Sequence, residues 1–325
     1  MNRLIHNPIT NAGHRAGAFV WGIYVLFEAK HLIYSILPPP YRFFLTDNKE
    51  VTSKLGKIKN LLNIIFILYT LTSCNLFDYH SLDGKVNINT VGKANADNIS
   101  VIESNTYNKS NVRFAFVTDT HRDDDETALF VKQMNERGDI DFILHGGDAT
   151  DFGYKREFEW TYRNLGKLTV PRVVLLGNHD ILAYGNLIYE SVYGSANFAF
   201  VVGAYKFIAL NTNRLEYENP ENIPDFNFMN RQIADYNKYK GIIVVMHAPP
   251  NGEQFYGEEI VRKFSDTLLH VPNLYFCLHG HTHHHSVSEL LNDGVTYIGC
   301  DNIAKRSYLI IDLSPDGYSY EIVRF

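Results

Sequence analysis

From Val112 onward, the chain alternates between short apolar runs and longer segments with apolar residues at helical spacing. Runs of this kind predict buried strands, and the segments between them predict amphipathic helices. The predicted strands are 112–118, 140–144, 172–176, 198–202, 206–211, 241–246 and 274–278, and the predicted helices are 126–137, 156–168, 226–239 and 258–270. Strands that alternate with helices in this way are typical of α/β domains.

The pattern changes near the C-terminus, where four apolar runs follow one another without a helix between them. Turn-forming residues, Asn292-Asp293-Gly294 and Pro315-Asp316-Gly317, join the first two runs and the last two. The runs are 286–291, 295–299, 307–312 and 318–323. The sequence therefore predicts a terminal β-meander and mixed sheets. Glycine-rich loops of the common nucleotide-binding types are absent from the sequence.

Two further apolar stretches precede this pattern. Residues 18–37 are long enough to cross a bilayer, but they contain Glu28, Lys30 and His31, which disfavour insertion near the membrane centre. Residues 61–71 follow a lysine-rich segment and lead directly into Leu71-Thr72-Ser73-Cys74. A basic segment followed by a short apolar run predicts a signal peptide, here over residues 51–74.

The residues around Cys74 resemble a bacterial lipobox, in which the cysteine becomes the lipidated first residue of the mature protein. This resemblance implies a protein of the bacterial cell envelope that is held at the membrane by a lipid anchor on Cys74, in a leaflet that the sequence leaves open. The alternative is an ordinary hydrophobic leader with an incidental cysteine.

The signal peptide begins some fifty residues into the chain, and no methionine lies between Met1 and Met134. This favours a translation start near Val51 or Leu55 from a non-ATG codon, with residues 1–50 as an upstream leader. Residues 75–110 are polar and rich in Asn, Ser and Lys, and they predict a tether and an early edge segment. The catalytic domain is then expected over residues 111–325.

Composition narrows the class of protein. The 325 residues are 45% hydrophobic and 20% charged, which suits a packed core and excludes a wholly disordered chain. The net charge of −6 argues against general nucleic-acid binding. Three cysteines are too few for a disulfide-built scaffold or a cysteine-type zinc site. Cys277 and Cys300 are predicted to be buried free thiols, and a bridge between them is the alternative.

Polar residues that can bind metal ions follow five of the predicted strands. The five motifs are Asp119-Thr120-His121, Gly147-Asp148-Ala149-Thr150-Asp151, Gly177-Asn178-His179-Asp180, His247-Ala248-Pro249 and His279-Gly280-His281-Thr282-His283. Each motif alone is weak, because a histidine after a strand is commonly structural. Ligands bind at the carboxyl ends of strands in open α/β sheets, so we expect the five motifs to converge. Imidazole, carboxylate and amide ligands without thiolate suit Mn, Fe, Zn or Ni.

Together the motifs resemble the signature of the calcineurin-like metallophosphoesterases, which reads D-x-H, G-D-x-x-[DE], G-N-H-[DE], a later H, and G-H-x-H. Every element of this signature occurs between Val112 and Phe325. The lipobox and residues 76–80 make the chain most similar to the bacterial lipoprotein members of the family. The resemblance implies an α/β fold of a defined kind, a four-layer α/β/β/α sandwich with two mixed β-sheets, which is the metallophosphoesterase fold.

The resemblance also implies two divalent metal ions, of which the identity stays open. The first ion would be bound by Asp119, His121 and His283, the second by Asn178, His247 and His281, and both by Asp148. His179 would protonate the leaving oxygen, while Asp180 would fix the tautomer of the His179 ring. The implied activity is hydrolysis of a phosphate mono- or diester by in-line attack of a metal-bridging hydroxide. Whether the substrate is a nucleotide, a lipid or a sugar phosphate stays open.

Other polar residues near the motifs are expected to have structural roles rather than to bind metal ions. Asp151 is expected to bind loop backbone or to cap the next helix rather than to touch a metal ion. His145 and His279 are expected to pack beneath the site, and His284 and His285 to lie on a solvated rim. The acidic run 123–126 is expected to begin a helix, where the helix dipole favours it.

Two other functions are alternatives to a phosphoesterase. A metal-binding envelope lipoprotein without catalytic activity would keep the fold and serve as a binding module, but the intact ligand set and the His179-Asp180 pair argue against it. A metallo-β-lactamase-type hydrolase would carry the H-x-H-x-D-H cluster, which this sequence lacks.

Overall fold

A computed structural model describes residues 57, 60, 61, 63, 64 and 92–325. The chain divides into two units, Met1–Asp78 and Tyr79–Phe325. The five described residues of the first unit are helical, and the rest of the predicted signal peptide, including Cys74, lies outside the described residues. Within the described ranges, no helix combines the length and apolar character needed to cross a membrane.

The described part of the second unit contains two β-sheets. The first sheet has the order β11-β10-β1-β2-β3, in which β1, β2 and β3 are parallel and β10 is antiparallel to both β1 and β11. Its strands are β1 (Val112–Val117), β2 (Phe142–His145), β3 (Arg172–Val174), β10 (Ser307–Ser314) and β11 (Gly317–Arg324). This sheet is therefore mixed, as the sequence predicts.

The second sheet has the order β4-β5-β6-β7-β9-β8. Its four central strands are parallel, while the edge strands β4 and β8 are antiparallel to their neighbours. The strands are β4 (Phe198–Val202), β5 (Tyr205–Leu210), β6 (Gly241–Met246), β7 (Leu274–His279), β8 (Ser286–Ser288) and β9 (Tyr297–Gly299). The parallel strands are buried on both faces, which explains why nearly all of their residues are apolar, with Lys206 of β5 and His279 of β7 as exceptions.

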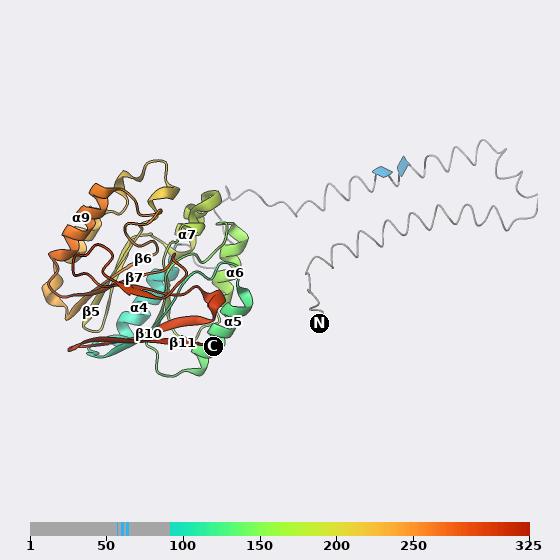
Figure 1. The fold of residues 1–325 in the computed structure, drawn as a ribbon. Coiled ribbons are helices and arrows are strands. Elements are labelled where there is room, and N and C mark those ends of the chain that lie inside the picture. Colours follow the sequence, from blue (N-terminus) through green and yellow to red (C-terminus); the bar gives the residue numbers. More distant parts are fainter. Residues whose placement is uncertain (1–56, 58–59, 62, 65–91) are drawn as a thin grey trace, which may run out of the picture. The chain divides into compact units, whose positions relative to one another are not determined.

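The two sheets face each other, and helices cover their outer faces (Figure 1). Side chains along β1 alternate between the two faces of its sheet. Phe114 packs between the sheets, with its ring centroid 5.3 Å from that of Phe207 in β5, whereas Ala115 belongs to the hydrophobic cluster between the first sheet and its helices. Helices α5 (Asp124–Glu136), α6 (Lys155–Leu165) and α7 (Gly185–Tyr193) cover the first sheet, and α8 (Phe226–Ile233) and α9 (Glu258–Leu269) cover the second. The predicted four-layer α/β/β/α sandwich is confirmed.

The predicted C-terminal meander is wrong. The four strands form two separate hairpins, and β8–β9 belongs to the second sheet while β10–β11 belongs to the first. Strand β10 is apolar and buried along most of its length, so it occupies an interior position beside β1, with Val112 opposite Leu313. Strand β11 alternates polar and apolar residues and lies at the sheet edge.

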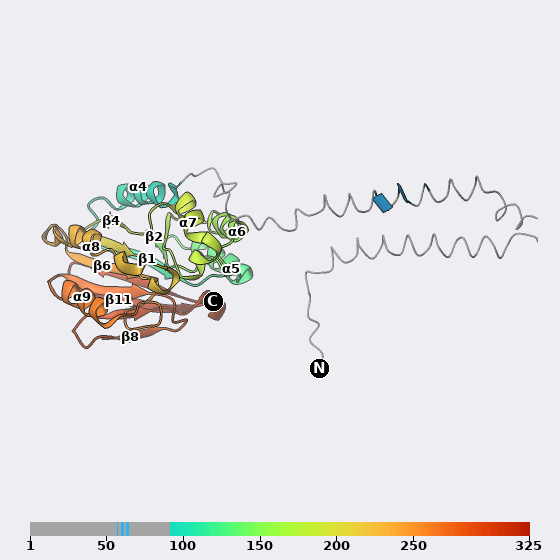
Figure 2. The same ribbon diagram turned by 90° about the horizontal axis from the view of Figure 1, so that it is seen from above.

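The predicted tether and edge segment is also wrong for its described part, because helix α4 (Ala94–Thr106) forms there. Side chains on α4 bind the open edge of β3. Asn95 Nδ2 donates to the Val174 carbonyl at 2.8 Å, and the Val174 N–H donates back to Asn95 Oδ1 at 3.0 Å. At the other sheet, the Val201 N–H of β4 donates to Glu103 at 3.0 Å. Figure 2 shows α4 lying along this side of the domain beside β4. The polar residues that suggested a tether instead cover two strand edges.

Candidate metal centre

The five motifs follow the carboxyl ends of strands from both sheets. Strands β1, β2 and β3 of the first sheet and β6 of the second end before four of the motifs, and β7 ends at His279, the first residue of the fifth. Residues from one sheet therefore meet residues from the other at a common end of the sandwich. The residues brought together in this way are Asp119, His121, Asp148, Asn178, His247, His281 and His283.

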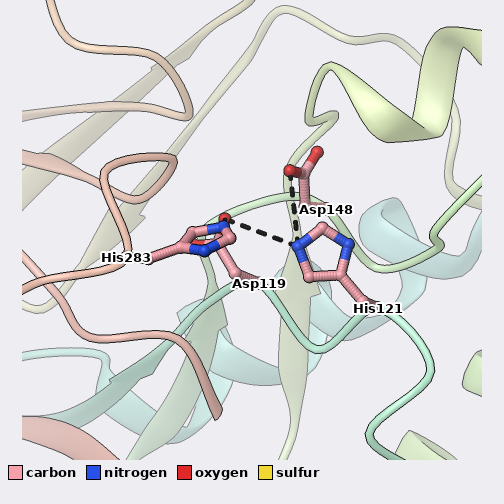
Figure 3. Close-up of side chains that lie close together, drawn as sticks. All are labelled: Asp119, His121, Asp148 and His283. Carbon is pink, nitrogen blue, oxygen red and sulfur yellow. Dashed lines mark ion pairs between the residues drawn. The ribbon is translucent and has the colours of Figure 1, made fainter. Parts of the chain in front are cut away.

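One group contains Asp119, His121, Asp148 and His283, whose potential ligand atoms all lie within 4.8 Å of one another (Figure 3). His283 Nε2 lies 3.1 Å from Asp119 Oδ1. His121 Nε2 lies 4.0 Å from that same oxygen and 3.8 Å from Asp148 Oδ2. We refer to Asp119, His121 and His283 as the first half-site.

A second group contains Asp148, His247 and His281, again with ligand atoms within 4.8 Å of one another. Asn178 joins this group, because its Oδ1 lies 2.9 Å from His281 Nδ1 and 3.1 Å from His247 Nε2. His247 Nε2 also lies 3.2 Å from Asp148 Oδ2. We refer to Asn178, His247 and His281 as the second half-site. Asp148 Oδ2 therefore contacts histidines of both half-sites.

Tight backbone turns make this convergence possible. Asp119, His121, Asp148, His281 and His283 all have positive φ, between 41° and 65°. Such left-handed conformations cost about 1–3 kcal/mol each and are concentrated at functional sites. The turns are held by hydrogen bonds between motifs, since the Asp119 N–H donates to the Gly147 carbonyl and the His121 N–H to the Asp148 carbonyl, both at 3.0 Å.

Two glycines allow the motif backbones to approach closely. A Cβ atom added at Gly177 would lie 2.1 Å from both the backbone nitrogen and Oδ1 of Asp148. Gly147 has φ +100°, and a Cβ there would lie 2.7 Å from His247 Nδ1. Larger residues at either position would displace a predicted ligand.

Each buried carboxylate is held by one oxygen and presents the other to the imidazoles. Asp119 Oδ2 accepts hydrogen bonds from the Thr118 hydroxyl at 2.6 Å and the His281 N–H at 3.2 Å. Asp148 Oδ1 accepts from the His179 N–H at 2.9 Å. Asp119 Oδ1 and Asp148 Oδ2 are thereby directed toward the two half-sites.

Backbone carbonyls orient two of the imidazole rings. His121 Nδ1 lies 3.2 Å from the Thr150 carbonyl oxygen, and His247 Nδ1 lies 2.9 Å from that of Gly146. When Nδ1–H donates to a carbonyl, Nε2 carries the lone pair and can bind a metal ion. In both residues Nε2 is the nitrogen that faces Asp148.

The electrostatics of the centre reflect its closely spaced carboxylates and imidazoles. Burial disfavours a charged His247, yet the neighbouring Asp148 carboxylate raises the pKa of His247 to about 9. Burial and the nearby His247 lower the pKa of His281 to about 4. For Asp119, burial opposes ionisation, but His283 and His247 hold the pKa of the carboxyl below its ordinary value. In the absence of a metal ion, the ionised carboxylates are thus balanced by a protonated His247, and a cation bound at Nε2 would take the place of that proton.

The residues fit a pair of divalent cations. His121 Nε2 is buried and has no hydrogen-bond partner among the described residues, and the buried Asp119 Oδ1 lies 4.0 Å from it and 3.1 Å from His283 Nε2. Buried polar atoms without partners are costly, and metal coordination is one way to satisfy them. Two carboxylates, one amide oxygen and four imidazoles without a thiolate suit Mn, Fe, Zn or Ni.

His179 lies beside the first half-site but does not belong to it. Its ring centroid is 4.7 Å from that of His121, and its side chain is 37% exposed. The expected contact between Asp180 and this ring is not found, because His179 Nδ1 lies 2.7 Å from the Asp151 carbonyl oxygen instead.

Asp180 has a different position from the one predicted. It is fully buried, and its carboxylate accepts hydrogen bonds from the backbone N–H groups of Gly177, Ala149 and Thr150 and from the Thr150 hydroxyl, at 2.8–3.2 Å. Asp180 therefore joins the turn after β3 to the turn after β2. The sequence could not distinguish these roles, because both place an acid directly after His179.

The predicted helix cap at Asp151 is also wrong. Tyr154 occupies the N-cap position of α6, and the Asp151 carboxylate instead forms an ion pair with Arg122 at 2.7 Å. Sequence reasoning missed Arg122, although it directly follows the Asp119-Thr120-His121 motif. It also missed Thr118, which precedes that motif and hydrogen-bonds Asp119.

The remaining expectations for this region agree with the structure except for His285, whose Nδ1 lies 3.0 Å from the Gly299 carbonyl oxygen rather than on a solvated rim. His145 and His279 are buried, and His145 Nε2 lies 3.0 Å from the Thr120 hydroxyl oxygen beneath the site. His284 is exposed and His285 partly buried, and residues 124–126 form the first turn of α5. Cys277 and Cys300 are buried free thiols.

Comparison with known proteins gives a consistent result. A model of the calcineurin-like phosphoesterases matches residues 112–285. A dimetal phosphatase from the zebrafish Danio rerio shares 10% identity, with 66% of this chain and 99% of that chain covered and a TM-score of 0.51. A purple acid phosphatase from yellow lupin, Lupinus luteus, shares 12% identity over 66% of this chain and 52% of that chain, with a TM-score of 0.50. Both have a similar fold. A search of curated proteins finds no match.

Proposed function

The chain belongs to the calcineurin-like phosphoesterase family, and from this premise we propose that it hydrolyses phosphate mono- or diesters with two divalent metal ions. The observation that carries the proposal is the pair of half-sites that share one oxygen of Asp148. Two cations a few ångströms apart require an anion between them, and Asp148 would supply it, because its Oδ2 lies 3.8 Å from His121 Nε2 and 3.2 Å from His247 Nε2.

We assign the metal ligands by half-site. Asp119, His121 and His283 would hold one ion, Asn178, His247 and His281 the other, and Asp148 both. When bound, a pair of such ions supplies Lewis-acid activation of water and neutralises charge on the phosphoryl oxygens. The protein residues supply the fixed spacing of the two ions and the orientation of each ligand atom.

His179 is proposed to donate the proton to the leaving oxygen. Its Nδ1 is engaged by the Asp151 carbonyl, which leaves Nε2 as the nitrogen that can face a substrate. Asp151 Oδ1 lies 3.8 Å from the same Nδ1, so the backbone and the side chain of Asp151 both face this edge of the ring. A direct reaction with water requires no covalent phosphoenzyme.

The experiment that tests this function uses the full-length protein loaded with Mn²⁺. Hydrolysis of para-nitrophenyl phosphate is compared with that of bis-para-nitrophenyl phosphate, so that the ratio reports the preference for mono- or diesters. Chelator-treated protein and the Asp148→Asn variant serve as controls. We expect metal-dependent turnover by the wild type and background turnover by both controls.

Two outcomes would contradict the proposal. If the wild type binds two metal ions but hydrolyses neither ester nor a broader panel of phosphoesters, the metal-binding scaffold becomes the better interpretation. If the wild type binds no metal, the assignment of the half-sites is wrong.

The anchor predicted at Cys74 is proposed on the sequence alone, because Cys74 lies outside the described residues. A lipid on this cysteine would hold the enzyme at the membrane of the bacterial cell envelope. Mass spectrometry of the mature protein should find a diacylglycerol-modified N-terminal Cys74, and Cys74→Ser should release the protein from the membrane fraction. An unmodified Cys74 within a longer mature chain would exclude the anchor.

A further inference from the structure

The segment that follows β9 contacts the first half-site. Residues 300–306 join β9 of the second sheet to β10 of the first, and they include the short 3₁₀-helix Ile303–Lys305. The Ile303 N–H donates to the Asp119 carbonyl at 3.4 Å, and Lys305 Nζ donates to the His283 carbonyl. The segment is therefore held against two of the residues that are assigned to the first metal ion.

Asn302 in this segment lies beside the ring of His283. Asn302 Nδ2 is 3.5 Å from His283 Nδ1, whereas His283 Nε2 lies 3.1 Å from Asp119 Oδ1. One ring nitrogen of His283 thus faces a carboxylate of the half-site, and the other faces the amide of Asn302.

The amide of Asn302 has an acceptor atom to spare. Asn302 is the N-cap residue of the 3₁₀-helix, but its side chain makes no capping hydrogen bond, although asparagine commonly caps in this way. Its Oδ1 is buried and has no hydrogen-bond partner among the described residues. A half-turn of the amide exchanges Oδ1 and Nδ2, which are nearly equal in size, and would bring Oδ1 to His283 Nδ1.

The other three histidines of the centre have different partners. Nδ1 of His121 and of His247 faces a backbone carbonyl, which can only accept a hydrogen bond. His281 directs Nδ1 itself into the second half-site, 2.9 Å from Asn178 Oδ1. At His283 the partner of Nδ1 is a carboxamide, which can donate or accept. The orientation of this amide therefore decides which nitrogen of the His283 ring carries the hydrogen.

His283 also needs such a partner more than His247 does. The side chain of His283 is partly exposed, while that of His247 is fully buried, so packing restricts the His283 ring less. The family model ends at residue 285, so Asn302 lies outside the segment that resembles other phosphoesterases.

We propose that Asn302 is a positioning residue for the first metal ion. With Oδ1 turned toward His283, the amide accepts the Nδ1–H, and Nε2 presents its lone pair on the side of Asp119. With Nδ2 turned toward His283, the hydrogen is on Nε2 and is donated to Asp119 Oδ1 instead. Binding of the ion is thus coupled to a turn of the Asn302 amide. This inference rests on the proposed function through the assignment of His283 as a ligand.

Calorimetric titration of the metal-free, full-length protein with Mn²⁺ tests this role without any turnover. The binding event of the first half-site is the one that Asp119→Asn removes. Asn302→Leu preserves the size of the side chain but removes its acceptor. It should raise the dissociation constant of that event by about tenfold to a hundredfold, the usual effect of losing the partner of a metal-binding histidine. The event of the second half-site should not change.

Two further variants separate positioning from a merely structural role. Asn302→Asp keeps an acceptor beside Nδ1 and should restore the affinity that Asn302→Leu loses. Asn219→Leu is the matched control, because Asn219 is also the N-cap residue of a short 3₁₀-helix, Pro220–Asn222, without a side-chain cap hydrogen bond. It should leave both events unchanged. Equal weakening in Asn302→Asp and Asn302→Leu, or wild-type affinity in Asn302→Leu, would overturn the proposal.

A spectroscopic measurement on the wild type does not depend on how the variants fold. In protein labelled with ¹⁵N-histidine and loaded with Zn²⁺, His283 should carry its hydrogen on Nδ1, and this hydrogen should exchange slowly with solvent although the ring is partly exposed. Rapid exchange, or a hydrogen on Nε2, would exclude the hydrogen bond to Asn302. Slow exchange in a protein that binds two ions but hydrolyses no ester would support the positioning role while the proposed function fails. A wild type that binds no ion at the first half-site would refute the role of Asn302.

Discussion

The two half-sites share one carboxylate but differ in charge and in exposure. With Asp148 included, the first half-site offers two carboxylates and two imidazoles, whereas the second offers one carboxylate, one amide and two imidazoles. The side chain of His283 in the first is 43% exposed, while that of His247 in the second is fully buried. Similar motifs at the ends of strands thus produce two unequal environments.

This difference predicts that the two half-sites bind their metal ions with different affinities. The additional carboxylate, Asp119, gives the first half-site the stronger attraction for a cation, so its ion should be held more tightly. The second half-site depends on Asp148 for its only negative charge. Removing the shared carboxylate should therefore affect both half-sites, and removing Asp119 only one.

The largest expected effect is that of Asp148→Asn. This variant should lose both ions and at least about 10³-fold in kcat, because bound metal ions supply several kcal/mol of transition-state stabilisation. Asp119→Asn should retain about one ion per chain. Metal content by mass spectrometry checks both variants, with the surface variant Asp139→Asn as the control. Two ions retained in Asp148→Asn would show that the half-sites are independent.

His179→Ala should have the next largest effect. It should reduce kcat by about 10²–10⁴-fold, the usual contribution of general acid catalysis, while both ions remain bound. The reason is that the His179 ring contacts His121 without belonging to either half-site. Parallel measurements of turnover and metal content test this separation. Loss of an ion together with activity would make His179 a ligand of the first half-site.

A smaller effect should appear in metal affinity. Titration of the metal-free protein with Mn²⁺ should resolve two binding events. Their dissociation constants should differ by about tenfold to a hundredfold, as expected for one additional carboxylate that is partly screened by its surroundings. Asn178→Asp gives the second half-site a carboxylate of its own and should therefore reduce the difference between the two dissociation constants. Calorimetry measures both constants. Equal affinities in the wild type would mean that burial, rather than charge, controls the two half-sites.

The smallest effect concerns the backbone that supports the shared carboxylate. Gly177→Ala should lower the free energy of unfolding by about 2 kcal/mol, because its Cβ would overlap the backbone and carboxylate of Asp148. Gly138→Ala is the matched control, since no atom lies within 4 Å of the added Cβ there. Urea denaturation of the metal-free protein compares the two. Equal stability of both variants would indicate that the turn at Gly177 can relax.

Much of the fold follows from the sequence. The apolar runs of β1, β6 and β7 are long enough and uniform enough to predict buried strands, and polar residues begin where each run ends. Because these positions follow strand ends, the set of seven candidate ligands could be proposed before their distances were known. The two carboxylates, the asparagine and the four histidines then meet in the structure as two groups that share Asp148.

Other features could not be predicted, because they depend on partners that are distant in sequence. Helix α4 has few apolar residues, and its Asn95 gains a role only beside Val174, which is 79 residues away. The final four strands follow one another in the sequence without an α-helix between them, but the two hairpins that they form belong to different sheets.

The sequence alone determined most of the strands and helices after Val112 and the chemical nature of the candidate metal ligands, because hydrophobic periodicity and residue type are local properties. Only the tertiary structure decided that Asp180 binds backbone rather than His179, that Asp151 pairs with Arg122, and that the half-sites differ in burial. These outcomes depend on where separate turns approach one another within a few ångströms. Such distances are fixed by the packing of the two sheets.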